Sequence, residues 1–363
     1  MNTNTITKTK GRDSRVELLR LFACLCVLML HFKPGSFVNG QRLFTRVFFT
    51  CLCTDAVGVF LFITGFFYFG NQNYSKRITT YLKSIFLPTV LYILFISLVY
   101  PVLVGSRASL STVSSELITT VTAWNPITHN AQHLWYMFLH GLIVLAFPVL
   151  AFIKQKLLVK DWQKAIFLLC VFCFLAINDY SGNRLLNAQM VPVTVLIPGC
   201  LYTLSGITIY EKRDIFRKNI LWFFGAVAVY GGVNLIRARH MTVMLNANSS
   251  ASHLYGWYTC AGFLCVISLS VAILSLKPFV NTFINKIAST TMDVYILHVV
   301  VSEVISDLGV KAWIISTFLN GSEALTEYLK FSFIYSTVVF LICCSISLIA
   351  KKLIKFIKIK TTS

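Results

Sequence analysis

The first long apolar run of the chain covers residues 16–32 and reads VELLRLFACLCVLMLHF. A helix needs about 20 predominantly apolar residues to cross the hydrocarbon core of a bilayer. A polar, basic segment precedes the run, and no small-residue cleavage site follows it, which is not the pattern of a secretory signal peptide. The run therefore predicts a first transmembrane helix that is retained in the protein.

Similar apolar runs recur along the whole chain. Hydrophobic residues make up 56% of the sequence and charged residues only 12%, whereas an ordinary soluble domain carries about 25% charged residues. We expect an all-α polytopic integral membrane protein with about ten transmembrane helices. The expected helices cover residues 16–32, 47–69, 81–104, 133–153, 165–178, 193–210, 219–236, 256–276, 288–308 and 329–350.

The formal net charge of +19 comes from 32 Lys and Arg against 13 Asp and Glu. The cations lie in short clusters between the apolar runs, which is typical of loops on the inner side of a membrane and not of a nucleic-acid-binding surface. With ten helices and both termini in the cytoplasm, 23 of the 32 cations fall inside and 9 outside. We therefore expect a cytoplasmic tail at 1–15, one transmembrane domain at 16–350 and a basic cytoplasmic tail at 351–363.

Three ionisable residues lie within the first predicted helix: Glu17, Arg20 and His31. Such residues are costly in a membrane and are functional candidates by default. Arg20 and His31 are eleven residues apart, so a helix places them within about 20° of one face and about 16 Å apart along its axis. Glu17 can pair with Arg20 at the i, i+3 spacing. The alternative is that Arg20 snorkels to the inner headgroups and His31 lies at the outer interface.

The next two predicted helices add further candidates. Asp55 begins a segment rich in Phe that contains Gly65, where the missing side chain allows close helix packing or local unwinding. Asp55 is expected either to orient His31 or a substrate hydroxyl, or to cap its helix as an interfacial N-cap. Arg77 and Lys83 lie at the inner entry of the third helix, where they suit a phosphate-rich ligand but also satisfy the positive-inside rule.

Histidines recur near the outer end of the fourth helix and in the ninth. His133 begins a segment in which Trp135 and Tyr136 are expected to be interfacial anchors. Tyr295 and His298 share one face of the ninth helix by their i, i+3 spacing. For both histidines a structural role and a working role remain open.

The eleven cysteines lie almost entirely within the apolar runs, where free cysteine behaves as a small hydrophobe. Cys170 and Cys173 form a CxxC pair, but no further ligands follow nearby, and a zinc site needs them. We therefore expect no metal.

Four of these segments together resemble the acyltransferase family 3 membrane proteins, bacterial O-acyltransferases that modify cell-surface glycans. Arg20 and His31 match an arginine, ten residues and a histidine in the first helix of the family. The block from Asp55 to Phe67 resembles an acidic residue, aromatics and Ser-Gly-Phe, with Thr64 at the serine position. The remaining two matches are a His-Leu-Trp motif at 133–135 and a late Tyr-x-x-His motif at 295–298.

The resemblance implies transfer of an acyl group, most often acetyl from acetyl-CoA, to a hydroxyl of a surface or lipid-linked glycan, by a multi-pass protein of the bacterial plasma membrane. It implies an acyl-CoA site at Arg20, Arg77 and Lys83, although the family often has Arg-x-x-Arg where this chain has Arg77 and, six residues later, Lys83. The implied catalytic residues, including those at the acyl-CoA site, are His31, Arg20, Glu17, Asp55 and His133, and the supporting residues are Trp135, Tyr295 and His298.

Two other classes of protein remain open. A transporter or lipid-linked glycan flippase also needs many helices with a few buried charges, although such proteins often show internal repeats or broken helices. A glycan polymerase or ligase is also polytopic and typically works through a large outer loop. The longest predicted outer loop here, residues 105–132, is modest for that purpose.

Overall fold

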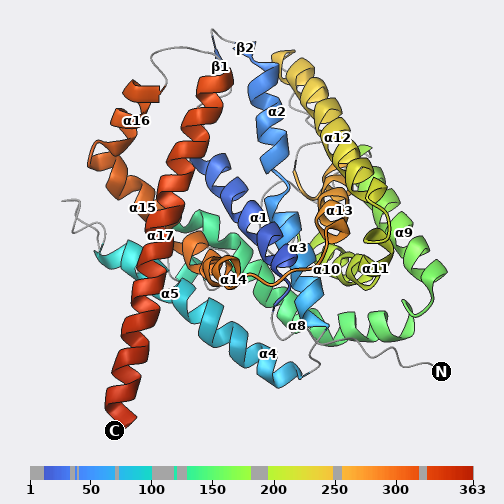
Figure 1. Ribbon diagram of the computed structural model, residues 1–363, viewed down its shortest axis with the longest axis horizontal. Coiled ribbons are helices and arrows are strands. Elements are labelled where there is room, and N and C mark those ends of the chain that lie inside the picture. Colours follow the sequence, from blue (N-terminus) through green and yellow to red (C-terminus); the bar gives the residue numbers. More distant parts are fainter. Residues whose placement is uncertain are drawn as a thin grey trace.

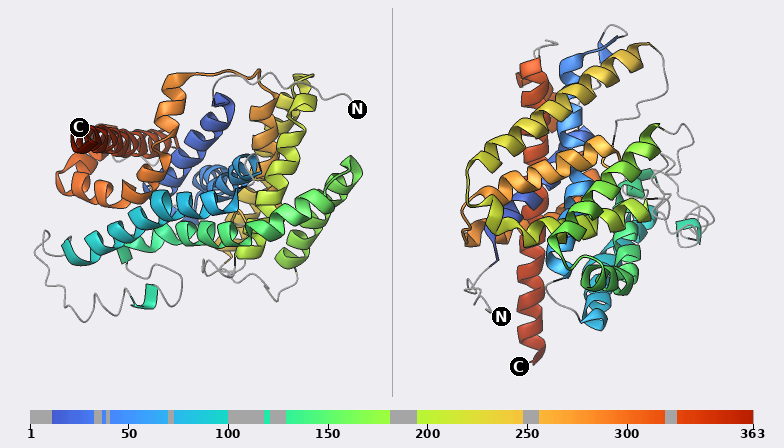
Figure 2. Two further views of the ribbon diagram at one scale, coloured as in Figure 1. Left: turned by 90° about the horizontal axis from the view of Figure 1, so that it is seen from below. Right: turned by 90° about the vertical axis from the view of Figure 1, so that its right-hand side faces the viewer.

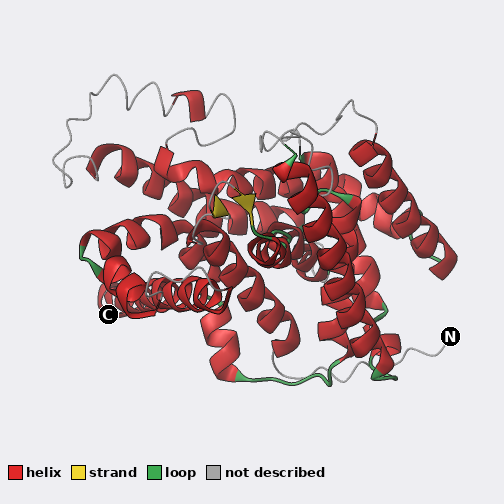
Figure 3. Cartoon of the chain, turned by 90° about the horizontal axis from the view of Figure 1, so that it is seen from above, coloured by secondary structure: helices red, strands yellow, loops and turns green. Residues whose placement is uncertain are grey.

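The computed structural model describes residues 12–32, 37–38, 41–69, 73–99, 118–120, 129–180, 195–247, 256–318 and 325–362. Within these ranges the chain is almost entirely helical (Figure 3), and the exceptions are two short antiparallel strands, β1 (Phe37–Val38) and β2 (Gln41–Arg42). Residues 1–11 of the predicted N-terminal tail, and residues 105–117 and 121–128 of the predicted outer loop, lie outside the described ranges.

The helices follow one another along the chain with short connections. In the first half they are α1 (Ser14–Phe32), α2 (Phe44–Cys53), α3 (Ala56–Tyr68), α4 (Tyr74–Tyr81), the π-helix η1 (Leu82–Phe86), α5 (Leu87–Leu94), the π-helix η2 (Phe95–Val99), the 3-10 helix η3 (His129–Leu134), α8 (Trp135–Lys156) and α9 (Asp161–Tyr180). In the second half they are α10 (Leu196–Glu211), α11 (Arg213–Phe216), α12 (Leu221–Asn246), α13 (Cys260–Ser275), α14 (Thr282–Ala288), α15 (Thr291–Asp307), α16 (Val310–Phe318) and α17 (Leu325–Thr362).

The first helix lies at the centre of the bundle (Figure 1), where it contacts α2, α3, α13, α14, α15 and α17. The helices α9 and α12 lie on the periphery, and α17 extends beyond the rest of the bundle towards the C-terminus (Figure 2). Large apolar side chains on the peripheral helices are exposed, among them Leu169, Ile177 and Phe224. Exposed apolar faces of this kind suit contact with lipid.

Six helical segments among the described residues are long and apolar enough to cross a membrane, and the bent pair α14–α15 would make a seventh. The chain is therefore a multi-pass membrane protein. The six segments cover Phe44–Tyr68, Tyr74–Ser97, Ala131–Lys156, Asp161–Tyr180, Leu221–Met244 and Leu329–Ile354. The other predicted spans coincide with α1, which carries several charges, with the shorter helices α10 and α13, and with the pair α14–α15, which is bent by 53°. The count of ten spans therefore stays a prediction.

Two boundaries differ from the sequence prediction. The second predicted helix is interrupted at Thr54 and Asp55, which separate α2 from α3. The seventh was expected to end at residue 236, but α12 continues to Asn246 and takes Arg237 into the bundle, where its side chain is fully buried. Arg237 was counted among the outer-loop cations, and that assignment was wrong because the apolar periodicity continues past it.

The start of α1 is fixed to the segment between α13 and α15. The Ser14 hydroxyl donates to the Asn285 side chain at 2.8 Å. The buried Arg15 guanidinium donates to the carbonyl oxygens of Leu274 and Leu276, both at 2.7 Å. Because these carbonyls end α13 without helical partners, the arginine satisfies groups that would otherwise be costly to bury. The ends of α1 and α13 therefore lie on the same side of the bundle.

Glu211 joins three further helix ends. Its carboxylate binds Lys154 at the end of α8 at 2.8 Å and Lys164 near the start of α9 at 2.5 Å. Burial by itself raises the pKa of Glu211, but the hydrogen bonds from the two lysines outweigh burial and leave the pKa below its ordinary value. The end of α10 thus lies beside the turn between α8 and α9, as the predicted alternation of helices requires.

The helices α3 and α10 cross in backbone contact at two glycines. A Cβ atom at Gly65 would lie 2.0 Å from the carbonyl oxygen of Thr203, and one at Gly206 would lie 2.1 Å from that of Phe62. Small residues let helices approach closely in membranes. The expected role of Gly65 in close packing is therefore confirmed, and this contact sets the position of α3.

We predict that Gly65→Ala destabilises the protein by about 1–3 kcal/mol or more, because the added methyl group meets backbone atoms that cannot rotate away. The measurement is the thermal unfolding midpoint of the purified protein in detergent. Gly225→Ala on α12 is the matched control, since a Cβ there meets nothing within 4 Å, and alanine favours a helix over glycine by about 1 kcal/mol. Equal midpoints for both variants would contradict the packing argument.

Candidate active site

Three histidines from different parts of the chain meet near the end of α1. The ring centroid of His298, on α15, lies 5.0 Å from that of His31 and 4.8 Å from that of His133 at the end of η3. His31 and His133 are 6.3 Å apart by the same measure. His298 and His133 are buried, whereas His31 is exposed. We call these three residues the histidine cluster.

Backbone contacts fix two of the three rings. The Nδ1 atom of His298 lies 2.8 Å from the carbonyl oxygen of Tyr295, and the Nε2 atom of His133 lies 3.3 Å from that of Ile296. The Tyr295 hydroxyl in turn donates to the carbonyl oxygen of His133 at 2.7 Å. The predicted shared face of Tyr295 and His298 is confirmed, and the late Tyr-x-x-His motif is joined to the His-Leu-Trp motif directly.

The other functional end of α1 carries the predicted ion pair. Arg20 donates to Glu17 at 2.9 Å, as the i, i+3 spacing predicts, and Glu17 is fully buried. The Arg20 guanidinium also lies 4.9 Å from the centroid of the exposed Phe67 ring at the end of α3. Glu17 therefore holds the cation near α3, with one fifth of the Arg20 side chain still exposed.

Arg77 comes to the same end of α3 from the opposite side of the sequence. Its guanidinium lies 4.8 Å from the Tyr68 ring centroid and 4.2 Å from that of Phe147 on α8. Its Nε and one terminal nitrogen are buried without a hydrogen-bond partner. These two nitrogens form the edge of a guanidinium that binds carboxylate or phosphate in a bidentate manner. Because Phe67 and Tyr68 are adjacent, α3 brings Arg20 and Arg77 to one place.

Lys83 is exposed on η1, beyond Arg77 along the same continuous helix. The helix widens into π geometry just before Pro88, which has no backbone N–H to continue the α-helical pattern. Such π-segments frequently occur at functional sites. Lys83 thus lies at the surface, in contrast to the partly buried Arg77.

A continuous row of four aromatic rings joins the cations to the histidine cluster. Tyr68, which contacts Arg77, hydrogen-bonds through its hydroxyl to Nε2 of His140. Ring centroids are then separated by 6.0 Å from His140 to Tyr136, by 5.7 Å from Tyr136 to Tyr295, and by 5.8 Å from Tyr295 to His298. We call Tyr68, His140, Tyr136 and Tyr295 the aromatic row. It contacts the cations at one end and the histidines at the other.

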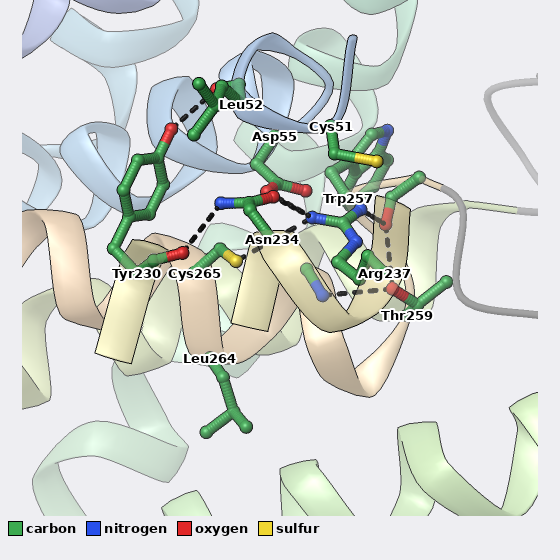
Figure 4. A network of polar contacts seen from close by, with 12 residues as sticks. Cys51, Leu52, Asp55, Tyr230, Asn234, Arg237, Trp257, Thr259, Leu264 and Cys265 are labelled. Carbon is green, nitrogen blue, oxygen red and sulfur yellow. Dashed lines mark hydrogen bonds and ion pairs between the residues drawn. The ribbon is translucent and has the colours of Figure 1, made fainter. Parts of the chain in front are cut away.

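Asp55 takes neither of the two roles expected from the sequence. At the break between α2 and α3 its side chain makes no helix-capping hydrogen bond. Its carboxylate is bound at 2.7 Å by Arg237 from α12, and not by His31 (Figure 4). Arg237 also contacts the Asn234 side chain at 3.2 Å and the Cys265 sulfur at 3.7 Å. The network joins α12, α13 and the start of α3, so Asp55 supports the position of α3.

The interfacial anchoring expected for Trp135 and Tyr136 was wrong. Both side chains are buried, and the Trp135 ring lies nearly parallel to that of Trp257 at 6.4 Å. The amphipathic character of these side chains suits a membrane interface and a protein interior equally, so composition could not decide. Arg237, Tyr68 and His140 were missed as site residues. A buried cation in a helix that continues past residue 236 was the available signal for Arg237.

We predict that Arg237→Met destabilises the protein by about 3–5 kcal/mol, because it leaves the buried Asp55 carboxylate without its cation. The double variant Asp55→Asn with Arg237→Met should recover part of that loss, since no buried charge remains. Thermal unfolding midpoints in detergent measure both effects. Arg239→Met, at an exposed position two residues away, is the matched control, and a double variant less stable than the single one would contradict the assignment.

The sequence profile of acyltransferase family 3, described as an acyltransferase domain, matches residues 13–350. The chain therefore belongs to acyltransferase family 3, and its reaction class is acyl transfer. No curated protein and no solved structure matches the chain. The match covers the histidine cluster, the aromatic row and both arginines in one domain.

Proposed function

We propose that the protein transfers an acyl group, most simply acetyl, from cytoplasmic acyl-CoA to a hydroxyl of a cell-surface or lipid-linked glycan. The observation that carries the proposal is the aromatic row, which connects two partly exposed cations to a cluster of imidazoles. Transfer between a phosphate-bearing donor and a hydroxyl acceptor needs these two kinds of group at separate places. The proposed setting is a bacterial plasma membrane, crossed by ten helices with both termini in the cytoplasm.

The cations are suited to the phosphates of CoA. Arg20 is held by Glu17, and Arg77 is held between Tyr68 and Phe147 with two guanidinium nitrogens still unpartnered. A preorganised guanidinium loses little freedom when it binds a phosphate. Lys83, exposed on the same helical stretch as Arg77, would add a more loosely held contact.

The histidine cluster supplies the chemistry in this proposal. His31 is its exposed member and is eleven residues from Arg20, which corresponds to about 16 Å along a helix. An extended pantetheine arm can cover such a span along the aromatic row. His31 then acts as general base on the acceptor hydroxyl, or accepts the acyl group transiently before passing it on. His133 shares the cluster and is placed to orient His31 or the acceptor.

The transporter and flippase alternative is weaker but distinct. It draws support from the broken pair α14–α15, because broken helices are common in transporters. In the present chain the break lies at residues 289–290, within two turns of Tyr295 in the aromatic row. A transporter would move its substrate without consuming acyl-CoA, so release of CoA separates the two classes.

The test is transfer of label from acetyl-CoA in membranes that contain the protein and native glycan acceptors. His31→Ala should lower the rate by about 10²–10⁴-fold, the usual contribution of a general base. Arg20→Ala should raise the KM for acetyl-CoA about tenfold or more, since a charge-assisted hydrogen bond contributes about 1.5–3 kcal/mol.

Arg239→Ala serves as the control for loss of a cation, because Arg239 is exposed on α12. Its transfer rate should equal that of the wild type. Equal rates for wild type and His31→Ala, with both proteins inserted at the same level, would remove His31 from the mechanism. Absence of labelled glycan and of released CoA in every sample would favour the transporter class.

A further inference from the structure

His298 is held in one tautomer by the backbone of its own helix. Its Nδ1 lies 2.8 Å from the carbonyl oxygen of Tyr295, three residues earlier on α15. A carbonyl oxygen only accepts hydrogen bonds, so the proton of the neutral ring is on Nδ1. The Nε2 atom of His298 is therefore a lone-pair acceptor.

This acceptor is buried and has no hydrogen-bond partner. Buried polar atoms are nearly always paired, and an unpaired one in a native protein calls for an explanation. The four rings nearest to His298 are those of Phe32, His31, His133 and Tyr295. The partner of Nε2, when it has one, must come from this group or from a bound molecule.

Three of the four rings have no proton to offer. Phe32 carries no polar hydrogen. The Tyr295 hydroxyl already donates to the carbonyl oxygen of His133. His133 directs Nε2 at the carbonyl oxygen of Ile296 at 3.3 Å, so its proton is on that nitrogen and is also used. His31 is the remaining imidazole, and no hydrogen bond of its ring occurs within the described part of the chain.

We propose that His298 is a positioning residue that accepts a hydrogen bond from His31 and so fixes which nitrogen of His31 serves as the base. Two imidazoles joined end to end by an N–H···N bond of about 3 Å have centroids about 5 Å apart, and His31 and His298 are 5.0 Å apart. The exposed His31 needs only to rotate for the bond to form. Hydrogen bonds of this kind are often unmade before substrate binds.

This role rests on the proposed function and specifies its chemistry. One nitrogen of His31 donates its proton to His298, and the other takes the proton of the acceptor hydroxyl as that oxygen attacks the thioester carbonyl. The carbon–sulfur bond then breaks, and the leaving CoA sulfur takes the proton from His31. An ester and a free thiol result, and His31 returns to its neutral form. A neutral imidazole here orients the base as a carboxylate does in hydrolase triads.

Two substitutions separate positioning from packing. His298→Asn keeps an amide N–H near the place of Nδ1, so the bond to the Tyr295 carbonyl is retained, but it offers no acceptor where Nε2 was. His298→Gln extends an amide oxygen to the place of Nε2 and restores the acceptor. We expect His298→Asn to lower kcat about a hundredfold with an unchanged KM for acetyl-CoA, and His298→Gln to recover most of that loss.

Wild-type kcat in His298→Asn, or equal loss in both variants, would overturn the positioning role while leaving the proposed acyl transfer in place. Absence of transfer by the wild type would overturn the proposed function and, with it, this role. A second measurement does not depend on turnover. In 15N-histidine spectra, with His298 assigned by its loss in His298→Asn, the ring should carry its proton on Nδ1, and a proton on Nε2 would overturn the proposal.

Discussion

Every ionisable group on α1 must be covered by protein, because lipid offers no partner for it, and this constraint organises the bundle. Glu17 is fully buried and Arg20 largely so. Six other helices contact α1 and provide this cover. The same enclosure creates the site, since helices that shield the polar face of α1 also present Tyr295, His298 and Tyr68 towards it. The cost of burying polar groups and the assembly of the site thus have one origin.

The position of α3 depends on two contacts that contain no site residue of their own. Gly65 and Gly206 bring its backbone against α10, and the Asp55–Arg237 ion pair fixes its start against α12. Its far end then carries Phe67 and Tyr68 to Arg20 and Arg77. A single short helix thereby links a buried ion pair to the cation end of the site.

Much of this arrangement could be predicted from the sequence, and the reasons for the failures are physical. Period and charge along α1 predicted the Glu17–Arg20 pair, because i, i+3 neighbours on one helix meet regardless of tertiary context. The partner of Asp55 could not be predicted, because Arg237 is 182 residues away and single-sequence patterns carry no information on such pairing. The burial of Trp135 also depended on Trp257, which only the folded chain brings near. The number of spans stays a prediction, since α10 and α13 are short and α1 is charged.

The central claim is that the two ends of the site have separate tasks: the arginines bind the donor, and the histidines act on its acyl group. The most direct measurement is protection of the purified protein against thermal unfolding by CoA, which has no acyl group to transfer. A ligand that binds only the folded state raises the midpoint in proportion to the logarithm of its saturation. The account predicts equal protection of wild type and His31→Ala, and loss of protection in Arg77→Ala. Full protection of Arg77→Ala, or none of His31→Ala, would contradict it.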